Sequence, residues 1–358
     1  MRKQIIISVL SYFLVFAING KAQQKWDTPN VGNILVPGYF ADPSILYDDQ
    51  RDSFYIYATT DGVWIGYSRE PHIAVSKDLV NWKFRPVSLP DYYPICTPQK
   101  PNSEKAGIWA PTVFKHPVNS KYYLGYQINI SFYVMVGDSP TGPWQNATLG
   151  NTAETAPLLK NKEQWGNGDS FDCQFFVDND NSVYITFGGG GRLGICKTKF
   201  DSVGHISIDN NDPRFTDGEK VKHLRVKLPD YTEAPIMFHK DTTYYLTYSC
   251  SAAQKYKVRY ATASSPTGPF TPHDGYIVQR NNSQSILGPG HNDILNYKGD
   301  FYILYHRQHY PMVDVKRQIC IDRILVNNGQ ISLNVQSHDG LNADEGALGK
   351  RYRKAKKA

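Results

Sequence analysis

Short apolar strands that alternate with polar turns recur along the chain from about residue 40 to residue 330. Aromatic and β-branched residues are frequent in them, and Gly or Pro interrupts the pattern every eight to twelve residues or so. No long stretch has the apolar spacing of an amphipathic helix. The pattern therefore predicts an all-β fold.

Five segments share one pattern, in which a short apolar strand, a polar turn and an aromatic-rich return strand follow each other. Their starts lie 58 to 67 residues apart, at Asp42, Trp109, Asp172, Glu233 and His291. A second hairpin fits into each interval, as in residues 74–82. Five units of four strands predict a single five-bladed β-propeller. A pair of β-sandwiches is the alternative, but it does not explain one double hairpin repeated throughout.

The first 22 residues follow a different pattern. Arg2 and Lys3 precede an apolar run from Ile5 to Ile18, and Gly20-Lys21-Ala22 has the small residues of a cleavage site. We expect residues 1–22 to be a signal peptide, 23–345 the propeller and 346–358 a basic tail. The apolar run is short for a membrane span of about 20 residues. We therefore expect no membrane span, and a protein that is secreted or periplasmic.

The net charge of +6 lies at the two ends of the chain. Nine Lys and Arg residues fall in the predicted signal peptide and the last nine positions, which leaves about −3 for the rest. A protein that binds nucleic acid concentrates basic residues on its folded body, so we expect no nucleic-acid partner.

The five cysteines are odd in number and scattered, without a CxxC or Cys/His metal spacing. We expect buried thiols, and a single disulfide is the alternative in an exported protein. They lie at Cys96, Cys173, Cys196, Cys250 and Cys320.

The five starting residues are candidates for a functional site, because the innermost strand of each blade lines the central channel of a propeller. They supply three carboxylates, an imidazole and an indole, which folding alone does not require. Two facing carboxyl groups are the minimum for hydrolysis of a glycosidic bond. A third carboxylate would raise the pKa of the acid, and an indole would offer a flat apolar surface to a sugar.

Five ordered motifs resemble glycoside hydrolase family 43, and the resemblance covers about residues 36–330. They are Phe40-Ala41-Asp42-Pro43-Ser44, Trp109-Ala110-Pro111, Asp172 with Phe175-Phe176-Val177-Asp178, Glu233-Ala234-Pro235 and Gly288-Pro289-Gly290-His291. Two departures from the family pattern are Cys173, where proline is frequent, and Asn181 in place of a turn glycine.

The resemblance implies roles for the three carboxylates. Asp42 would be the general base that activates water, Glu233 the general acid, and Asp172 the residue that orients Glu233 and tunes its pKa. The family inverts anomeric configuration, which goes with carboxyl groups about 6.5–9.5 Å apart.

The resemblance also implies further site residues, each with a simpler alternative. His291 would lie at the channel centre beside a calcium ion whose shell water completes, or it is a hydrogen-bonded core histidine. No cofactor is otherwise expected. Arg317 would reach the sugar, or it is a surface cation. Trp109 and Phe40 would contact substrate, although Trp109 could instead fill the inner layer of its blade.

The expected substrate is a plant oligosaccharide or polysaccharide that contains arabinose or xylose. We expect an α-L-arabinofuranosidase on family grounds, with β-D-xylosidase and endo-arabinanase as alternatives. A carbohydrate-binding propeller without activity would tolerate loss of a carboxylate, and all three are present. A retaining fructan hydrolase or transferase would carry Asn-Asp-Pro and Arg-Asp-Pro motifs. The sequence lacks Arg-Asp-Pro, and its Asn-Asp-Pro at residues 211–213, which Arg214 follows, lies away from the five repeated starts.

Overall fold

The computed structural model describes residues 33–36, 38–61, 72–86, 109–128, 130–148, 156–160, 170–309, 316–333, 336 and 340–341. The predicted signal peptide, the predicted basic tail and Cys96 lie outside these residues.

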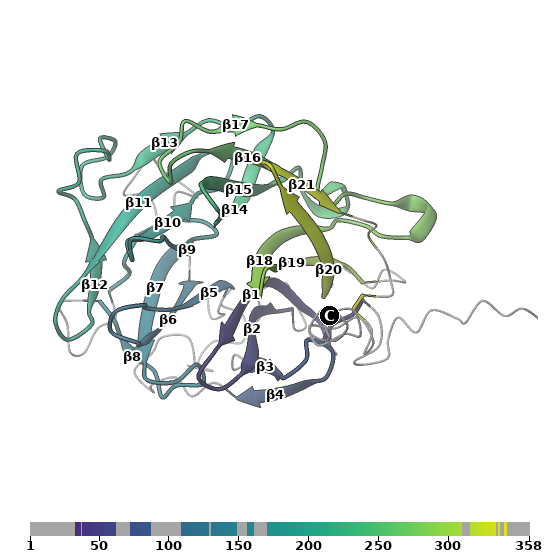
Figure 1. The fold of residues 1–358 in the computed structure, drawn as a ribbon, viewed down its shortest axis with the longest axis horizontal. Coiled ribbons are helices and arrows are strands. Elements are labelled where there is room, and N and C mark those ends of the chain that lie inside the picture. The colour runs from purple at the N-terminus through teal and green to yellow at the C-terminus, as the bar shows by residue number, and fades with distance from the viewer. Residues whose placement is uncertain are drawn as a thin grey trace, which may run out of the picture.

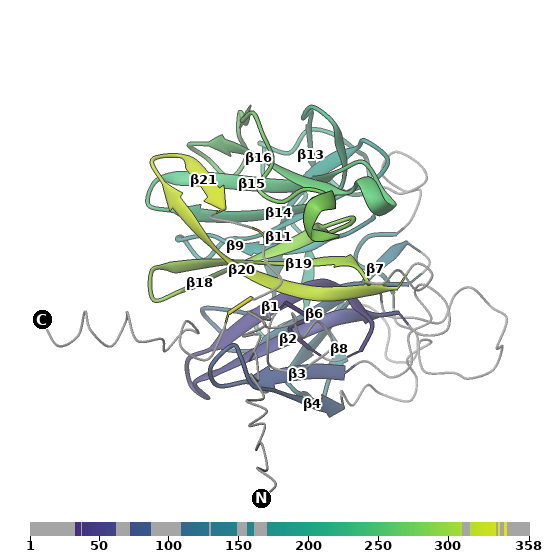
Figure 2. The same ribbon diagram turned by 90° about the vertical axis from the view of Figure 1, so that its right-hand side faces the viewer.

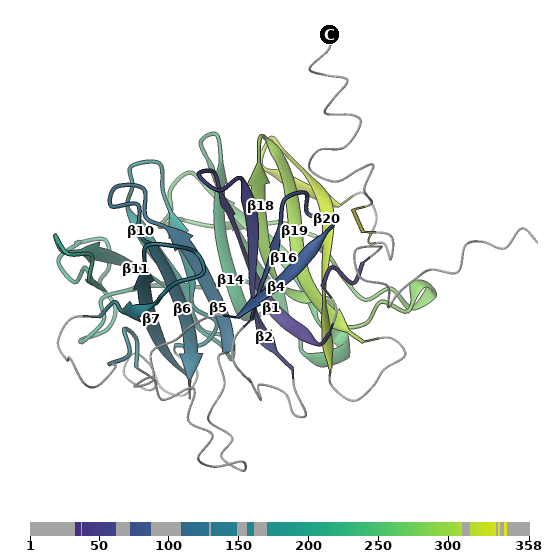
Figure 3. The same ribbon diagram turned by 90° about the horizontal axis from the view of Figure 1, so that it is seen from below.

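The described strands form five antiparallel sheets arranged around a common centre, so the chain is a five-bladed β-propeller (Figure 1). Each sheet is built from consecutive strands, and the first strand of each lies nearest the centre. The inner strands contact one another around the ring, β1 against β5 and β18, β9 against β5 and β14, and β14 against β18. Seen from below, the long strands of successive sheets run in about the same direction, as expected for strands that line a channel (Figure 3).

The first three sheets come from the N-terminal half of the described chain. The first holds β1 (Phe40–Asp48), β2 (Ser53–Thr60), β3 (His72–Ser76) and β4 (Trp82–Pro86). The second holds β5 (Trp109–Lys115), β6 (Tyr122–Ile128), β7 (Ser131–Gly137) and β8 (Gln145–Asn146). The third holds β9 (Gln174–Val177), β10 (Val183–Phe187), β11 (Leu193–Phe200), β12 (Ile206–Ile208) and β13 (Leu224–Val226).

The last two sheets complete the ring. The fourth holds β14 (Tyr231–Lys240), β15 (Thr243–Cys250), β16 (Lys257–Ala263) and β17 (Thr271–Pro272). The fifth holds β18 (Gly290–Tyr297), β19 (Asp300–Gln308), β20 (Arg317–Asn327) and β21 (Gln330–Leu333). Two short 3₁₀ helices, η2 (Ala253–Lys255) and η3 (Asn282–Gln284), lie in connections.

The third sheet departs from the predicted four strands because two strands share one edge of β11. β12 pairs with Thr198–Phe200 of β11, and β13 pairs with Leu193–Ile195. The predicted turns are otherwise present, and Asn181 adopts the left-handed conformation (φ 67°) that a turn glycine would take.

Four inner strands, β1, β5, β14 and β18, are each interrupted by a two-residue bulge whose first residue has a positive φ. The corresponding pair in the third blade, Asp172 and Cys173, lies just before β9, between Gln174 and Phe171, which accepts a backbone hydrogen bond from Gly188. Those first residues are Asp42, Ala110, Asp172, Ala234 and His291, with φ between 41° and 54°. The sequence alignment of the five starting residues is therefore wrong by one residue for Trp109 and Glu233. These two are the last paired residues before the bulge, opposite Gln127 and Ser249. Three blades present the bulge residue to the site, and two present the residue before it.

The bulges are fixed by hydrogen bonds from the preceding blade. The backbone N–H of Ala110 donates to Thr59 Oγ1 (2.8 Å), and that of His291 donates to Ser249 Oγ (2.9 Å). At the junction of the fifth and first blades, the backbone nitrogen of Asp42 lies 3.3 Å from His306 Nδ1. At these three junctions, a buried polar side chain on the second strand of one blade thus holds the inner strand of the next blade.

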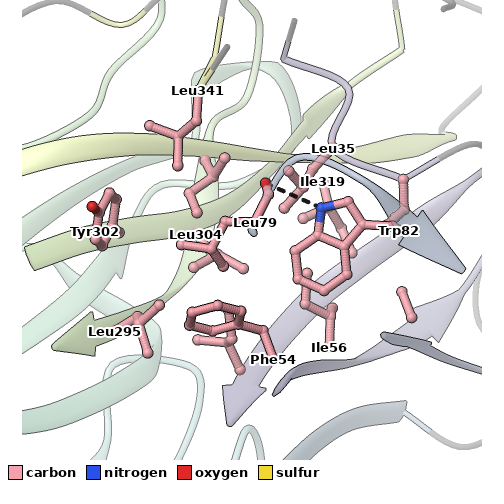
Figure 4. Close-up of a cluster of buried hydrophobic side chains, with 14 of the residues drawn as sticks. Leu35, Phe54, Ile56, Leu79, Trp82, Leu295, Tyr302, Leu304, Ile319 and Leu341 are labelled. Atoms are coloured by element: carbon pink, nitrogen blue, oxygen red, sulfur yellow. Dashed lines mark hydrogen bonds between the residues drawn. The ribbon is translucent and has the colours of Figure 1, made fainter. Parts of the chain in front are cut away.

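Five hydrophobic clusters fill the spaces between neighbouring sheets, one cluster for each pair of blades. Figure 4 shows the cluster between the first and fifth blades, where Phe54 and Trp82 meet Leu295 and Leu304. The indole nitrogen of Trp82 donates to the carbonyl oxygen of Leu79 (3.2 Å), which satisfies the buried donor. The core therefore holds each blade to its neighbours rather than filling the centre of the ring.

The fifth blade lies between the fourth and the first (Figure 2). The segment before β1 binds the fifth blade and so closes the ring. Asn33 is fully buried, and its side chain donates to Asp322 Oδ1 (3.0 Å) and accepts from the backbone of Ile321 (2.7 Å). The backbone of Leu35 donates to Ile319 (2.8 Å).

The four described cysteines are buried thiols, as predicted: Cys173, Cys196, Cys250 and Cys320. Cys173 occupies the second bulge position, where three other blades have proline. Within the described residues, no helix is long and apolar enough to cross a membrane.

Candidate active site

Three predicted site residues, at the bulge positions of the first, third and fifth blades, meet at the centre of the ring. His291 Nδ1 lies 3.3 Å from Asp42 Oδ1 and 3.3 Å from Asp172 Oδ2. All three side chains are at most 2 % exposed. Burial alone would lower the pKa of His291, but the two carboxylates outweigh it and raise this pKa to about 9. The imidazole is therefore a cation that holds two carboxylates together.

Asp42 is surrounded by positive and polar groups. Besides His291, its Oδ1 lies 2.9 Å from Arg317 Nη1 and 3.0 Å from His306 Nδ1. Burial alone would raise the pKa of Asp42, but Arg317 and His291 hold it well below the usual range. Asp42 is therefore ionised at any pH at which the protein would work. Its Oδ2 has no hydrogen-bond partner among the described residues.

Arg317, the first residue of β20, is held in turn by a second buried carboxylate. Its Nε and Nη2 each lie 2.8 Å from an oxygen of Asp61, which is 3 % exposed and follows β2. This bidentate pair fixes the plane of the guanidinium group. The prediction that Arg317 belongs to the site is consistent with this placement, and three of its nitrogens are occupied by carboxylates.

Glu233 has the opposite electrostatic environment. It accepts a hydrogen bond from the hydroxyl of Tyr256, which follows η2. Burial, followed by the negative charge of Asp172, raises the pKa of Glu233 to about 7. Burial also raises the pKa of Asp172, against the effect of His291. The pKa of Asp42 is thus lowered and that of Glu233 raised within the same site, which is the arrangement expected of a base and an acid.

The two aromatic residues predicted to contact substrate lie in different surroundings. Trp109 is half-buried, and its ring centroid lies 5.6 Å from the guanidinium carbon of Arg317, which places it beside the carboxylates. Phe40 stacks on the ring of Phe84 (5.4 Å) and packs against the core between the first and fifth blades. A contact between Phe40 and substrate stays a prediction, which this packing does not favour.

The predicted calcium ion beside His291 also stays a prediction. The Nε2 atom of His291 faces Gln174 Nε2 at 3.5 Å, while its Nδ1 faces the two carboxylates. Within the described residues, no group of three or more His, Cys, Asp or Glu residues is placed to hold a metal ion. An ion at Nε2 would therefore need water for most of the six to eight oxygens that calcium prefers.

Three residues of the site were not predicted from the sequence: Asp61, Tyr256 and His306. All three lie outside the inner strands on which the repeat was aligned. His306 carried a usable signal, because it faces the last residue before the bulge, as Ser249 does in the fourth blade. Nothing in the sequence distinguishes Tyr256 from the other 24 tyrosines.

A known protein family matches most of the chain. The sequence model described as "Glycosyl hydrolases family 43" matches residues 31–331, which is most of the chain. The chain belongs to glycoside hydrolase family 43, and it is a glycosidase.

Several relatives of this family 43 chain are known. It is 28 % identical over 343 residues to the β-D-galactofuranosidase xynD of Aspergillus niger, and the match covers 90 % of this chain and 91 % of that protein. It is 29 % identical over 231 residues to an arabinoxylan arabinofuranohydrolase of Bacillus subtilis, covering 56 % of this chain and only 40 % of that longer protein. A solved structure named as a glycoside hydrolase has a TM-score of 0.69 at 28 % identity, covering 90 % of this chain and 67 % of that one.

Proposed function

We propose that this family 43 glycosidase hydrolyses the bond to a terminal or side-chain sugar with inversion, using Asp42 as general base and Glu233 as general acid. The observation that carries the proposal is the opposite shift of the two pKa values, far down for Asp42 and up to about 7 for Glu233. One group is therefore ionised and the other protonated near neutral pH, as inverting hydrolysis requires.

In this mechanism Asp42 takes a proton from the attacking water. Its Oδ1 is held by Arg317, His291 and His306, which leaves Oδ2 as the oxygen that accepts the proton. Glu233 gives its proton to the leaving oxygen. Asp172 keeps Glu233 protonated through its negative charge, and the half-buried Trp109 would support a sugar face.

The proposed substrate is an arabinose- or xylose-containing oligosaccharide or polysaccharide, and we rank α-L-arabinofuranosidase activity first. Support comes from two relatives named for furanosidases, one acting on galactofuranosides and one on arabinofuranosyl groups. The rings of β-D-galactofuranose and α-L-arabinofuranose have the same configuration from C1 to C4. β-D-galactofuranosidase activity is therefore the second candidate, and β-D-xylosidase and endo-arabinanase are further alternatives.

The test is hydrolysis of aryl α-L-arabinofuranoside, β-D-galactofuranoside and β-D-xyloside, beside an arabino-oligosaccharide. Wild type is compared with Glu233→Ala and with the exposed-residue control Glu219→Ala. We expect turnover of a furanoside that falls at least about 100-fold in Glu233→Ala on the oligosaccharide, and less on aryl substrates, whose leaving groups need less protonation. Glu219→Ala should match wild type.

Other outcomes discriminate between the alternatives. Cleavage of the xyloside alone would replace the furanosidase assignment, and internal cleavage of arabinan would indicate an endo-acting enzyme. Binding of the oligosaccharide without hydrolysis of any substrate would contradict the catalytic proposal in favour of a carbohydrate-binding propeller.

A further inference from the structure

The fifth blade has glycine at a position where two other blades carry a predicted site residue. The last paired residue before the bulge is Trp109 in the second blade, Glu233 in the fourth and Gly290 in the fifth, where it lies opposite His306. The position that carries an indole in the second blade and a carboxyl group in the fourth therefore has no side chain in the fifth.

The ring of Tyr256 fills this space. A Cβ atom on Gly290 would lie 1.6 Å from Tyr256 Cδ1 and 2.2 Å from Cε1, distances that only glycine permits. The ring also stacks on the imidazole of His306, with centroids 5.5 Å apart and planes inclined by 17°. Tyr256 is 5 % exposed, so these contacts hold a buried ring.

The phenol hydroxyl at the end of this fixed ring donates to Glu233 Oε1. Burial holds the pKa of Tyr256 well above its usual value, so the hydroxyl keeps its proton over the working pH range. A donor at Oε1 leaves Oε2 as the oxygen of Glu233 that carries the proton when the group is neutral.

We propose that Tyr256, held by its contacts with Gly290 and His306, is a positioning residue that fixes the carboxyl group of Glu233 and selects Oε2 as the oxygen that protonates the leaving group. This inference rests on the proposed function and adds a residue to its acid. The same ring stacks on His306, which contacts Asp42, so Tyr256 and His306 connect the proposed acid to the proposed base.

The hydrogen bond should also adjust the titration of Glu233. Among the described residues, five titratable groups interact with this carboxyl group: Asp172 and Asp42 raise its pKa, Tyr256 and His291 lower it, and Tyr231 lies near enough to be affected by its charge. A donor favours the ionised carboxylate, so removing the Tyr256 hydroxyl should raise the pKa of Glu233 above about 7.

The test is Tyr256→Phe, which keeps the contacts of the ring with Gly290 and His306 and removes only the hydroxyl. The matched control is Tyr248→Phe, because Tyr248 is a fully buried tyrosine of the same blade whose hydroxyl has no hydrogen-bond partner in the described structure. Both variants are first compared with wild type by circular dichroism and thermal unfolding. Rates are then measured on an arabino-oligosaccharide and on a 2,4-dinitrophenyl glycoside of the same sugar.

Two results are expected of Tyr256→Phe and not of Tyr248→Phe. The basic limb of the kcat/KM profile, where the general acid ionises, should move up by about 0.5 to 1 pH unit. Turnover of the oligosaccharide should fall about 10-fold and turnover of the dinitrophenyl glycoside much less, because a good leaving group needs little protonation. An unmoved basic limb, or an equal loss on both substrates, would overturn the proposal.

Glu233→Ala, measured beside these variants, separates the two levels of the argument. If it keeps the activity of wild type, the acid assignment fails and the proposed function with it. If Glu233→Ala loses activity on the oligosaccharide while Tyr256→Phe behaves like Tyr248→Phe, the acid stands and only the role of Tyr256 is refuted.

Discussion

Arg317 and Asp42 form a buried ion pair, with Nη1 2.9 Å from Oδ1, across the junction of the first and fifth blades. The guanidinium group is itself fixed by two hydrogen bonds of 2.8 Å to Asp61. Besides the predicted contact with sugar, Arg317 therefore lowers the pKa of Asp42 and keeps this proposed general base ionised.

Replacing Arg317 by Gln should make the enzyme sensitive to acid. Activity needs ionised Asp42 and is lost as the pH falls through its pKa. Removal of the neighbouring cation raises that pKa by about one to three units towards the ordinary range, so kcat/KM of the variant should fall at an acid pH at which wild type is still active. The control is Arg323→Gln, an exposed arginine of the same strand that pairs with Asp300. An acid limb at the wild-type pH would refute this role of Arg317.

Asp172→Asn should act on the opposite limb. The negative charge of Asp172 raises the pKa of Glu233, so its loss should lower that pKa from about 7 and shift the basic limb down by about one pH unit. The maximal rate should fall as well. Asp178→Asn, in a residue just beyond the other end of β9, serves as control. A basic limb that stays in place in Asp172→Asn would contradict the modulating role.

Glu233→Gln should stabilise the fold at alkaline pH. The pKa of Glu233 is raised from 4.5 to about 7, so its contribution to stability is fully present below pH 4.5 and is lost as the pH rises through about 7. The variant has no charge to bury, and its free energy of unfolding should exceed that of wild type by up to about 3 kcal/mol at pH 8. Urea unfolding at pH 4.5 and pH 8 measures the difference, and an equal gain at both pH values would count against the raised pKa.

Asn33→Ala should loosen the closure of the ring without touching the chemistry. It removes two buried hydrogen bonds and leaves the polar groups of Asp322 and Ile321 without these partners, at a cost of about 1–3 kcal/mol in the free energy of unfolding. Asn211→Ala, in an exposed loop, is the control. Stability equal to that of the control would show that the segment before β1 does not close the ring.

The sequence was sufficient for the fold because each blade is a contiguous run of hairpins with its own turn residues. The alignment of the repeat failed by one residue at Trp109 and Glu233, since a bulge shifts the register without changing the apolar pattern. Aligning the prolines at the second bulge position, Pro43, Pro111 and Pro235, would have corrected it.

The site was predictable only in part. Asp42, Asp172 and His291 were found because they occupy one repeated position, and the structure places each of the two carboxylates 3.3 Å from His291 Nδ1. Tyr256 and Asp61 lie beyond the second strands, where no repeat marks them. Their contribution depends on distances across blades, which a single sequence does not contain.

The most direct test of the central claim, that Asp42 activates a water molecule which attacks opposite the leaving group, is the configuration of the first sugar released. Proton NMR during the first minutes of hydrolysis, on whichever glycoside the wild-type enzyme cleaves, distinguishes the two anomers before they equilibrate. The account predicts the inverted sugar, β-L-arabinofuranose from an α-L-arabinofuranoside. Release of the sugar with retained configuration would contradict it, because that result requires a carboxylate to attack carbon directly.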